Sequence, residues 1–158
     1  MEYRVGLGID AHALAEGVPL ILGGVRLDWP RGLVGHSDGD VIAHALIDAL
    51  LGAAGMGDIG TLFPSQDERY RGADSLELLA EAYRKVREAG FVLVNADCVL
   101  VGEEPRIAFL REEMQARLAG ALGVEPEQVA VRATTTDRLG FTGRGEGLAA
   151  QAVALLRR

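Results

Sequence analysis

The amino-acid sequence predicts an α+β fold, a two-layer sandwich in which a mixed β-sheet carries helices on one face. Apolar runs of strand length occur at the start of the chain and again in its second half, and the segments between them repeat apolar residues at helical spacing. A glycine pair between two short apolar runs indicates an early hairpin. The 158 residues, 49% apolar and 25% charged, fit a single globular domain over residues 1–158.

The first elements are a strand and a hairpin. Tyr3–Ile9 is an apolar run of strand length. Gly23-Gly24 lies between the short apolar runs Leu20–Leu22 and Val25–Leu27, which is typical of two strands joined by a tight turn. A mixed sheet is therefore expected, because a hairpin pairs its strands in the antiparallel sense.

Two helices separated by a loop follow the hairpin. The stretch from about Asp40 to Ala54 is mostly apolar and predicts a helix. Residues 55–73 are rich in glycine and aspartate and predict a loop with at most a turn of helix. Ser75–Ala89 is expected to be the second helix, because its apolar residues repeat at helical spacing and Asp74 can cap it.

The second half alternates strands with helices. Phe91–Val101 and Val129–Thr134 are predicted strands, and Pro105 is expected to open a helix that runs to about Leu122. A glycine-rich loop and a final helix from about Gly147 to Leu156 complete the chain. Helices on one face leave the other face of the sheet bare, and because an apolar face must be buried, we expect a homo-oligomer.

The composition excludes several classes of protein. The chain has 16 basic and 23 acidic residues, a net charge of −7, whereas nucleic-acid scaffolds usually carry a basic stripe, so no nucleic-acid partner is expected. No apolar run approaches the roughly 20 residues that span a bilayer, and no signal peptide is evident, so we expect a cytoplasmic protein without a membrane partner. The single cysteine, Cys98, is expected to be a small buried hydrophobe.

Two of the three histidines lie in one stretch, GHSDGDVIAHALIDALLG, at residues 35–52. On a helix, positions four apart share a face, so Asp40, His44 and Asp48 form a polar stripe on an otherwise apolar helix. On a strand, positions two apart point the same way, so Asp10 and His12 in GIDAH share a face. This stripe of carboxylates and imidazole is therefore not simply the solvated side of a helix.

Asp10, His12 and His44 together offer two nitrogen ligands and one oxygen ligand. Zn²⁺ takes such sets, and catalytic zinc usually has three protein ligands and one open position, so we expect these three residues to bind zinc. The pattern alone also fits an Asp-x-His pair on a strand surface and an Asp40 favoured by the helix dipole. Asp48 is expected either to orient His44 as a hydrogen-bond acceptor or to have a helix-capping or subunit-contact role.

Three further segments carry polar groups suited to a substrate. Ser37 or Asp38 can cap the first helix, while His36 can face an anion beside backbone N–H groups. GDIGTLFPSQD, at residues 57–67, has the composition of an active-site loop. RATTTDRLGFTGRGEG, at residues 132–147, suits a phosphate or a base. Its glycines do not form a dinucleotide fingerprint, because threonines separate them from the preceding strand.

Long ordered motifs carry a resemblance over essentially the whole chain. DAH, GHSDGDVIAHALIDALLGAAGMGDIGTLFP, GADSLELL and ATTTDRLGFTGRGEG resemble the 2-C-methyl-D-erythritol 2,4-cyclodiphosphate synthases of the non-mevalonate isoprenoid pathway. The resemblance implies a homotrimer with sheets packed around the threefold axis and active sites at subunit interfaces. It also implies a phosphorus–oxygen lyase that converts 4-diphosphocytidyl-2-C-methyl-D-erythritol 2-phosphate to the 2,4-cyclodiphosphate and CMP.

The resemblance assigns roles to individual residues. The family's zinc ligands fall on Asp10, His12 and His44, the set that the spacing suggests. His36 and Thr135 are implied in stabilising the transition state. The implied substrate-binding residues are Asp10, His12, His36, Ser37, Asp58, Ile59, Gly60, Phe63, Asp67, Pro105, Arg106, Thr134, Thr135, Thr136, Asp137, Phe141 and Arg144.

The chain departs from the family's pattern in three places, two single residues and one tripeptide. Asp137 falls where a second divalent ion, Mg²⁺ or Mn²⁺, bridges the diphosphate, but the family's ligand is often the longer Glu. Ser65 stands where many relatives have an acidic residue. Gly102-Glu103-Glu104 replaces smaller and less charged residues within the implied cytidine-binding segment, Gly102–Ala108. Side-chain contacts at these positions are therefore expected to differ from the family's.

Two other classes of function compete with this enzyme. A non-catalytic trimer would hold an isoprenoid diphosphate in its axial cavity, which the loop with Arg144 and Glu146 could reach. A metal-dependent phosphohydrolase would use water as its nucleophile. Release of CMP separates the enzyme from the first class, and the absence of ¹⁸O uptake from water separates it from the second.

Overall fold

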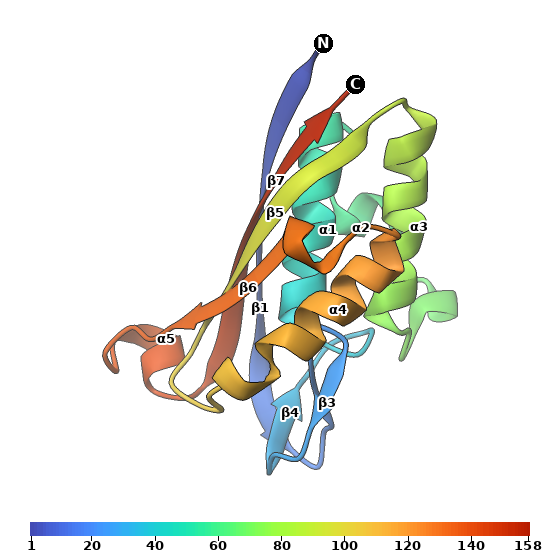
Figure 1. Ribbon diagram of the computed structural model, residues 1–158. Coiled ribbons are helices and arrows are strands. Elements are labelled where there is room, and N and C mark those ends of the chain that lie inside the picture. Colours follow the sequence, from blue (N-terminus) through green and yellow to red (C-terminus); the bar gives the residue numbers. More distant parts are fainter.

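The computed structural model describes residues 1–158, in which a five-stranded mixed sheet has the strand order β4-β1-β7-β5-β6 and β2-β3 form a separate hairpin (Figure 1). The strands are β1 (Tyr3–Glu16), β2 (Leu20–Leu22), β3 (Val25–Leu27), β4 (Arg31–Leu33), β5 (Val92–Val101), β6 (Val129–Thr134) and β7 (Gly147–Arg157). The helices are α1 (Val41–Ala54), α2 (Ile59–Leu62), α3 (Ser75–Glu88), α4 (Arg111–Leu122) and α5 (Gly140–Gly143), with 3₁₀ turns η1 (Glu68–Tyr70), η2 (Ala108–Leu110) and η3 (Pro126–Gln128).

The elements form two layers, as the sequence predicts. Helices α1, α3 and α4 lie on one side of the sheet, and Figure 1 shows the two chain ends close together at one end of it. Helix α1 packs across β1 and β7, α4 packs on β6, and α3 packs against both helices. Only β5 and β6 pair in parallel, so the sheet is mixed. No helix has the length and apolar character needed to cross a membrane.

Helix α1 lies unusually close to β1, because two glycines leave room for it. A Cβ atom added at Gly8 would overlap the carbonyl oxygen of Ala45, and one added at Gly6 would overlap that of Ala49. Both clashes involve helix backbone, which cannot rotate away as a side chain can. The Gly-x-Gly spacing in β1 therefore serves helix–strand contact, and Asp10 follows on the same face of the strand.

The final segment is a strand, so the predicted helix from Gly147 to Leu156 is wrong. Strand β7 is the central strand of the sheet and pairs with β1 on one side and β5 on the other. Its burial alternates with period two: Leu148, Ala150, Ala152, Ala154 and Leu156 are buried. The alanines favour a helix by intrinsic propensity, but here they keep the surface beneath α1 shallow. Tertiary packing therefore overrides local preference.

Other boundaries differ from the predictions in smaller ways. Strand β1 extends seven residues beyond Ile9 to Glu16, where it pairs with β4, a strand that the sequence did not predict. The helix expected from Pro105 begins only at Arg111, after the 3₁₀ turn η2. The short helix α2 and the turn η1 lie in the expected loop. The irregular connections at these positions carry little periodic signal.

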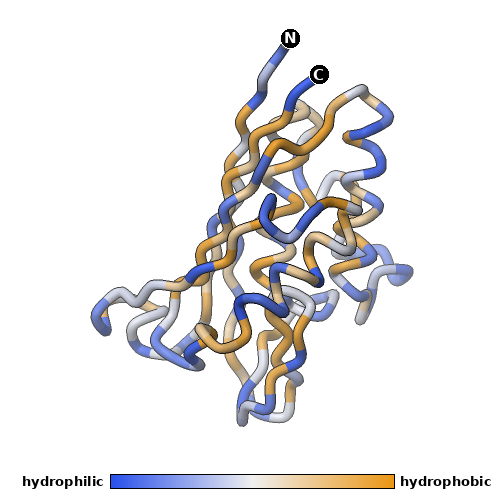
Figure 2. Tube along the Cα trace, in the orientation of Figure 1, coloured by the Kyte–Doolittle hydropathy of each residue, from blue (hydrophilic) through white to orange (hydrophobic).

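The face of the sheet opposite the helices is bare and apolar. Val5, Leu7 and Ile9 of β1 are 69%, 59% and 58% exposed, and Val153 of β7 lies on the same face with 43% exposure. Figure 2 shows the apolar colouring that runs along these long strands. The sequence-based expectation of an uncovered apolar face is confirmed, and such a face favours contact with another chain.

One buried carboxylate ties the hairpin to α1. Asp40, which is fully buried, accepts hydrogen bonds from the backbone N–H groups of Gly23 (2.9 Å), Gly24 (2.8 Å) and Ala43 (3.1 Å). Burial raises the pKa of Asp40 to about 6, against the opposing effect of these three donors. Asp40 is thus the N-cap of α1, in place of the predicted Ser37 or Asp38.

Gly8→Ala should lower the free energy of unfolding by about 3 kcal/mol, because the new methyl group forces α1 away from β1. Denaturant unfolding of the two proteins measures this difference. The matched control is Gly120→Ala in α4, where an added Cβ meets no atom within 4 Å. The control should gain about 0.5–1 kcal/mol from higher helix propensity. A Gly8→Ala protein as stable as the wild type would contradict the close packing described here.

Candidate metal centre and active site

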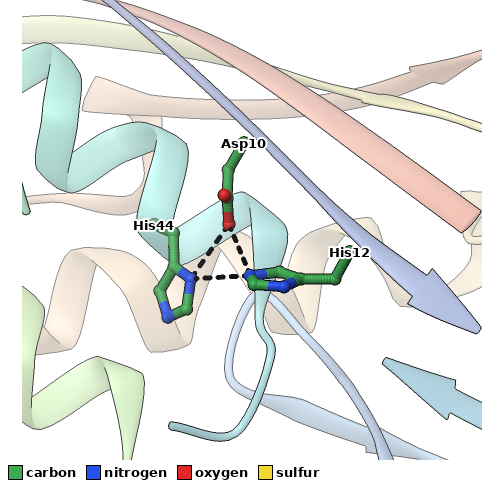
Figure 3. Close-up of side chains that lie close together, drawn as sticks. All are labelled: Asp10, His12 and His44. Carbon is green, nitrogen blue, oxygen red and sulfur yellow. Dashed lines mark hydrogen bonds and ion pairs between the residues drawn. The ribbon is translucent and has the colours of Figure 1, made fainter. Parts of the chain in front are cut away.

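Three side chains from two elements converge beside the α1–β1 contact. Asp10 and His12 project from the same face of β1, and His44 projects from α1 toward them (Figure 3). Asp10 Oδ2 lies 2.9 Å from His44 Nδ1 and 3.0 Å from His12 Nε2, and the two histidine nitrogens are 3.4 Å apart. The fold thus brings together Asp10, His12 and His44, the residues that the period-two pattern of the strand and the i+4 pattern of the helix predicted as ligands.

The spacing of these three atoms fits a single metal ion. A tetrahedral ion with bonds of about 2.0–2.1 Å places its ligand atoms roughly 3.3 Å from one another. The observed separations of 2.9, 3.0 and 3.4 Å bracket that value. Asp10, His12 and His44 form a group of side chains that could hold a metal ion.

The contacts within this group shift the pKa values of Asp10 and His12 in opposite directions. Burial would raise the pKa of Asp10, but hydrogen bonds from His12 and His44 and the attraction of their charges lower it to about 2. The hydrogen bond to Asp10 raises the pKa of His12, against the opposing effect of burial. Asp10 is therefore a carboxylate at neutral pH, as metal ligation requires.

The second ring nitrogen of His44 is held by two serines. Nε2 lies 2.9 Å from Ser37 Oγ and 2.8 Å from Ser75 Oγ. Ser75 is fully buried at the start of α3 and also bonds the carboxylate of Asp38. Neither contact was predicted: Ser75 was expected only as the first residue of a helix and Asp38 as a possible cap, because α3 lies far from His44 along the chain.

A cavity of about 200 Å³ opens beside the three ligands. Its walls come from β1, the loop before α1, α1 itself, α2, the loop that follows α2, the turn η1 and the first turn of α3. The lining residues are Asp10, His12, His36, Ser37, His44, Ile59, Gly60, Phe63, Ser65, Tyr70 and Leu78. Eight of these are predicted site residues, and Ser65 is the position noted above for its departure from the family's pattern. Tyr70 and Leu78 were not predicted, because apolar wall residues carry no distinctive spacing.

Two further predicted residues, Asp67 and Asp58, lie at the cavity's edge rather than in its lining. The main-chain oxygen of Asp67 accepts a hydrogen bond from His36 Nε2 at 2.9 Å, while the Asp67 side chain pairs with Arg69. Asp58 is exposed and caps α2 by accepting from the backbone N–H of Thr61 at 2.8 Å. Hydrogen bonds with Thr61 lower the pKa of Asp58.

The remaining candidate residues lie elsewhere in the same chain. They belong to the end of β6, to the loops after β5 and β6 and to α5 with the residue that follows it. Figure 1 shows this part projecting beyond the sheet away from α3, and no residue after Leu78 lines the cavity. These residues are Pro105, Arg106, Thr134, Thr135, Thr136, Asp137, Phe141 and Arg144. Glu103 holds this loop by accepting from the N–H groups of Thr136 and Arg138, both at 3.2 Å.

Asp48 does not orient His44, so that prediction is wrong. Its Oδ1 accepts a hydrogen bond of 2.6 Å from the backbone N–H of Ile59, the first residue of α2. The alternative role in helix capping therefore fits the contact. Burial raises the pKa of Asp48, with Ile59 acting in the opposite direction. The i+4 spacing places Asp48 on the correct side of α1 but one turn too far from the imidazole.

Asp48→Ala should loosen the cavity wall without weakening metal binding. The N–H of Ile59 loses its partner, so amide hydrogen exchange should become faster across Ile59–Phe63. Divalent-metal affinity, measured by competition with a chelator, should stay within about threefold of the wild type, because Asp48 touches none of the three ligands. A loss of tenfold or more would restore the rejected role of Asp48 beside His44.

Comparisons with known proteins agree with this geometry. The model of the YgbB family matches residues 3–157. The 2-C-methyl-D-erythritol 2,4-cyclodiphosphate synthase of Rubrobacter xylanophilus is 61% identical over 99% of this chain and 96% of its own length. The solved CDP-bound form of 2C-methyl-D-erythritol-2,4-cyclodiphosphate synthase has a TM-score of 0.88 and 39% identity, covering 98% of this chain and 100% of that one.

A longer protein contains the same fold as one part. The bifunctional IspDF from Campylobacter jejuni has a TM-score of 0.94 and 46% identity to this chain, covering 98% of this chain but only 42% of the bifunctional one. The sequence matches and the structural matches both cover nearly the whole chain. The chain belongs to the YgbB family, the family of the 2-C-methyl-D-erythritol 2,4-cyclodiphosphate synthases.

Proposed function

We propose that this chain is a phosphorus–oxygen lyase of the non-mevalonate isoprenoid pathway. It would convert 4-diphosphocytidyl-2-C-methyl-D-erythritol 2-phosphate into 2-C-methyl-D-erythritol 2,4-cyclodiphosphate and CMP. The observation that carries the proposal is the convergence of Asp10, His12 and His44 on one point beside a cavity. Relatives that match nearly the whole chain are named for this synthase activity.

The metal that suits the three ligands best is Zn²⁺. Two imidazole nitrogens and one carboxylate oxygen form a common catalytic zinc set, and three protein ligands leave a fourth position for substrate. When bound, zinc would supply a Lewis acid for a diphosphate oxygen. The protein's contribution is to keep the three ligand atoms, Asp10 Oδ2, His12 Nε2 and His44 Nδ1, within 3.4 Å of one another before the substrate arrives.

The reaction brings two phosphates together and needs no side-chain nucleophile. An oxygen of the 2-phosphate forms a bond to the β-phosphorus of the diphosphate, and the bond from that phosphorus to the oxygen of CMP breaks. Like charges approach each other, so the protein must position the groups and supply positive charge or hydrogen-bond donors. No water enters the product, which separates this cyclisation from hydrolysis.

His36 is placed to donate to such a phosphate. Its Nε2 already donates to the main-chain oxygen of Asp67, and the ring lines the cavity. Nδ1 therefore donates only when the ring is doubly protonated, so the proposed role requires the imidazolium form. A donor of this kind, aimed at a developing charge, is worth about 2–4 kcal/mol.

The cavity walls suit the sugar-like part of the substrate. Ile59, Gly60 and Phe63 offer backbone groups and apolar surface beside the three ligands. Ser37, whose hydroxyl lies 2.9 Å from His44, and the Asp58 carboxylate at the cavity's edge would supply groups that bind hydroxyls. We assign the methylerythritol portion to this wall.

A complete site needs a second copy of the chain. The nucleotide-binding candidates, Thr134–Asp137 with Pro105, Arg106, Phe141 and Arg144, do not line the cavity of their own chain. We propose a homotrimer in which bare sheet faces pack around the threefold axis and this loop reaches a neighbour's cavity. Thr135 and Asp137 would then face the nucleotide phosphates, with Asp137 holding a second divalent ion, Mg²⁺ or Mn²⁺.

Phosphorus NMR of the product tests the proposed reaction. With zinc and Mg²⁺, the cytidyl substrate should yield CMP and a product whose two phosphorus nuclei couple to each other, with no ¹⁸O from labelled water. His44→Ala should remain folded but lose zinc and nearly all turnover, because one of three ligands is missing. Wild-type protein stripped of metal and then reloaded with zinc is the matched control.

Two results would contradict the proposal. Uptake of ¹⁸O into a non-cyclic product would indicate a phosphohydrolase, and binding of an isoprenoid diphosphate without CMP release would indicate a non-catalytic binding protein. Normal turnover by zinc-free His44→Ala protein would remove the ligand role of His44.

A further inference from the structure

The imidazole of His44 is connected to a carboxylate through a buried hydroxyl. His44 Nε2 lies 2.8 Å from Ser75 Oγ, and Ser75 Oγ in turn bonds Oδ1 of Asp38. Asp38 Oδ2 also accepts from the backbone N–H of Ser75 at 2.9 Å, and its Oδ1 accepts from the N–H of Asp40 at 3.1 Å. Three donors therefore converge on one Asp38 carboxylate.

The positions of the hydrogens follow from what each group can donate. An ionised carboxylate has only acceptors, and a serine hydroxyl has one hydrogen. The hydroxyl hydrogen of Ser75 is therefore directed to Asp38, which leaves the Ser75 oxygen to accept from the Nε2–H of His44. With Nε2–H directed to Ser75, Nδ1 is the ring nitrogen that faces Asp10 and His12, and a metal bound there would take the Nδ1 lone pair in place of the hydrogen bond to Asp10.

We propose that Asp38 and Ser75 act together as a positioning pair that fixes the tautomer and orientation of His44 for metal binding. This inference rests on the zinc site proposed above. Ligating histidines commonly donate their second N–H to a fixed acceptor, and loss of such a partner typically costs 10–100-fold in metal affinity. Here the acceptor is the neutral hydroxyl of Ser75, and the charged group that orients this hydroxyl, the Asp38 carboxylate, lies one hydrogen bond further from His44.

Ser37 and Ser75 both contact His44 but differ in surroundings. Ser37 lines the cavity, whereas Ser75 is fully buried and does not. The hydroxyl of Ser37 is thus available to a substrate, while that of Ser75 has only His44 and Asp38 as partners. Ser75 is the partner that stays with His44 whether or not the cavity is filled.

Backbone pairing holds this arrangement together across a long sequence separation. The N–H of Asp38 donates to the carbonyl oxygen of Ala73 at 3.1 Å, and the N–H of Gly72 donates to that of His36 at 2.7 Å. These two bonds attach the segment before α1 to the segment before α3. The start of α3 is thereby placed against His44, which makes Ser75 part of the metal site.

A double-mutant cycle on zinc affinity tests the proposal. Asp38→Asn, Ser75→Ala and the double variant are compared with the wild type by competition with a zinc chelator. Each single change should lower affinity about 10–100-fold. The double variant should bind zinc at most about threefold less tightly than the single variant with the lower zinc affinity. Two residues that act on His44 through one another lose a shared interaction, so their effects on affinity do not add. The visible absorption of Co²⁺-loaded protein should change in all three variants, since the ring orientation changes.

Controls separate a positioning role from a structural one. Asp74→Asn removes an exposed carboxylate beside Ser75 but keeps an N-cap for α3, so zinc affinity and the Co²⁺ spectrum should match the wild type. Far-UV circular dichroism of each metal-free variant checks folding. If Asp38→Asn fails to fold, Ser75→Ala still decides the question, because alanine is smaller and suits a first helical turn.

Three results would overturn the proposal. Folded single variants that bind zinc as tightly as the wild type, or losses that add in the double variant, would show that Asp38 and Ser75 do not act on His44 as a pair. A wild-type protein that binds no zinc would remove the proposed metal site itself, which distinguishes failure of the proposed function from failure of this inference.

Discussion

The close approach of α1 to β1 is the constraint on which the rest of the molecule depends. Gly6 and Gly8 remove the side chains that would hold the helix off the strand, and the alanines of β7 keep the adjacent surface shallow. One step further along the same face of β1 come Asp10 and His12. They meet His44 because the helix has been brought to within contact distance of the strand. The close packing of α1 on β1 in the core is therefore also what brings the three metal ligands together at the cavity.

The segment from His36 to His44 illustrates how few residues serve fold and chemistry at once. Asp40 caps α1 and binds the hairpin, Asp38 binds Ser75, and His44 completes the ligand set. His36 is anchored through its Nε2, so one ring nitrogen is left for a substrate. Burial of these polar groups is tolerated because each has a partner, and no buried side-chain nitrogen or oxygen atom lacks one.

Sequence patterns predicted the residues of the metal site better than the elements around it. Period two in β1 and period 3.6 in α1 are local, so spacing singled out Asp10, His12 and His44 as a candidate ligand set, although the pattern alone also fitted a pair on a strand surface. The contacts of Ser75 with His44 and of Asp48 with Ile59 depend on which elements meet, which no local period encodes. Strand β7 was mistaken for a helix because an alanine-rich run fits both structures until its neighbours in the sheet are known.

The most direct test of the account is to locate the metal by anomalous diffraction from crystals of the zinc-loaded protein at the zinc absorption edge. If Asp10, His12 and His44 hold the metal, one peak should lie about 2.0–2.2 Å from Asp10 Oδ2, His12 Nε2 and His44 Nδ1 together. A peak bound through the other nitrogen of His44, or one that lies away from the α1–β1 contact, would contradict that assignment.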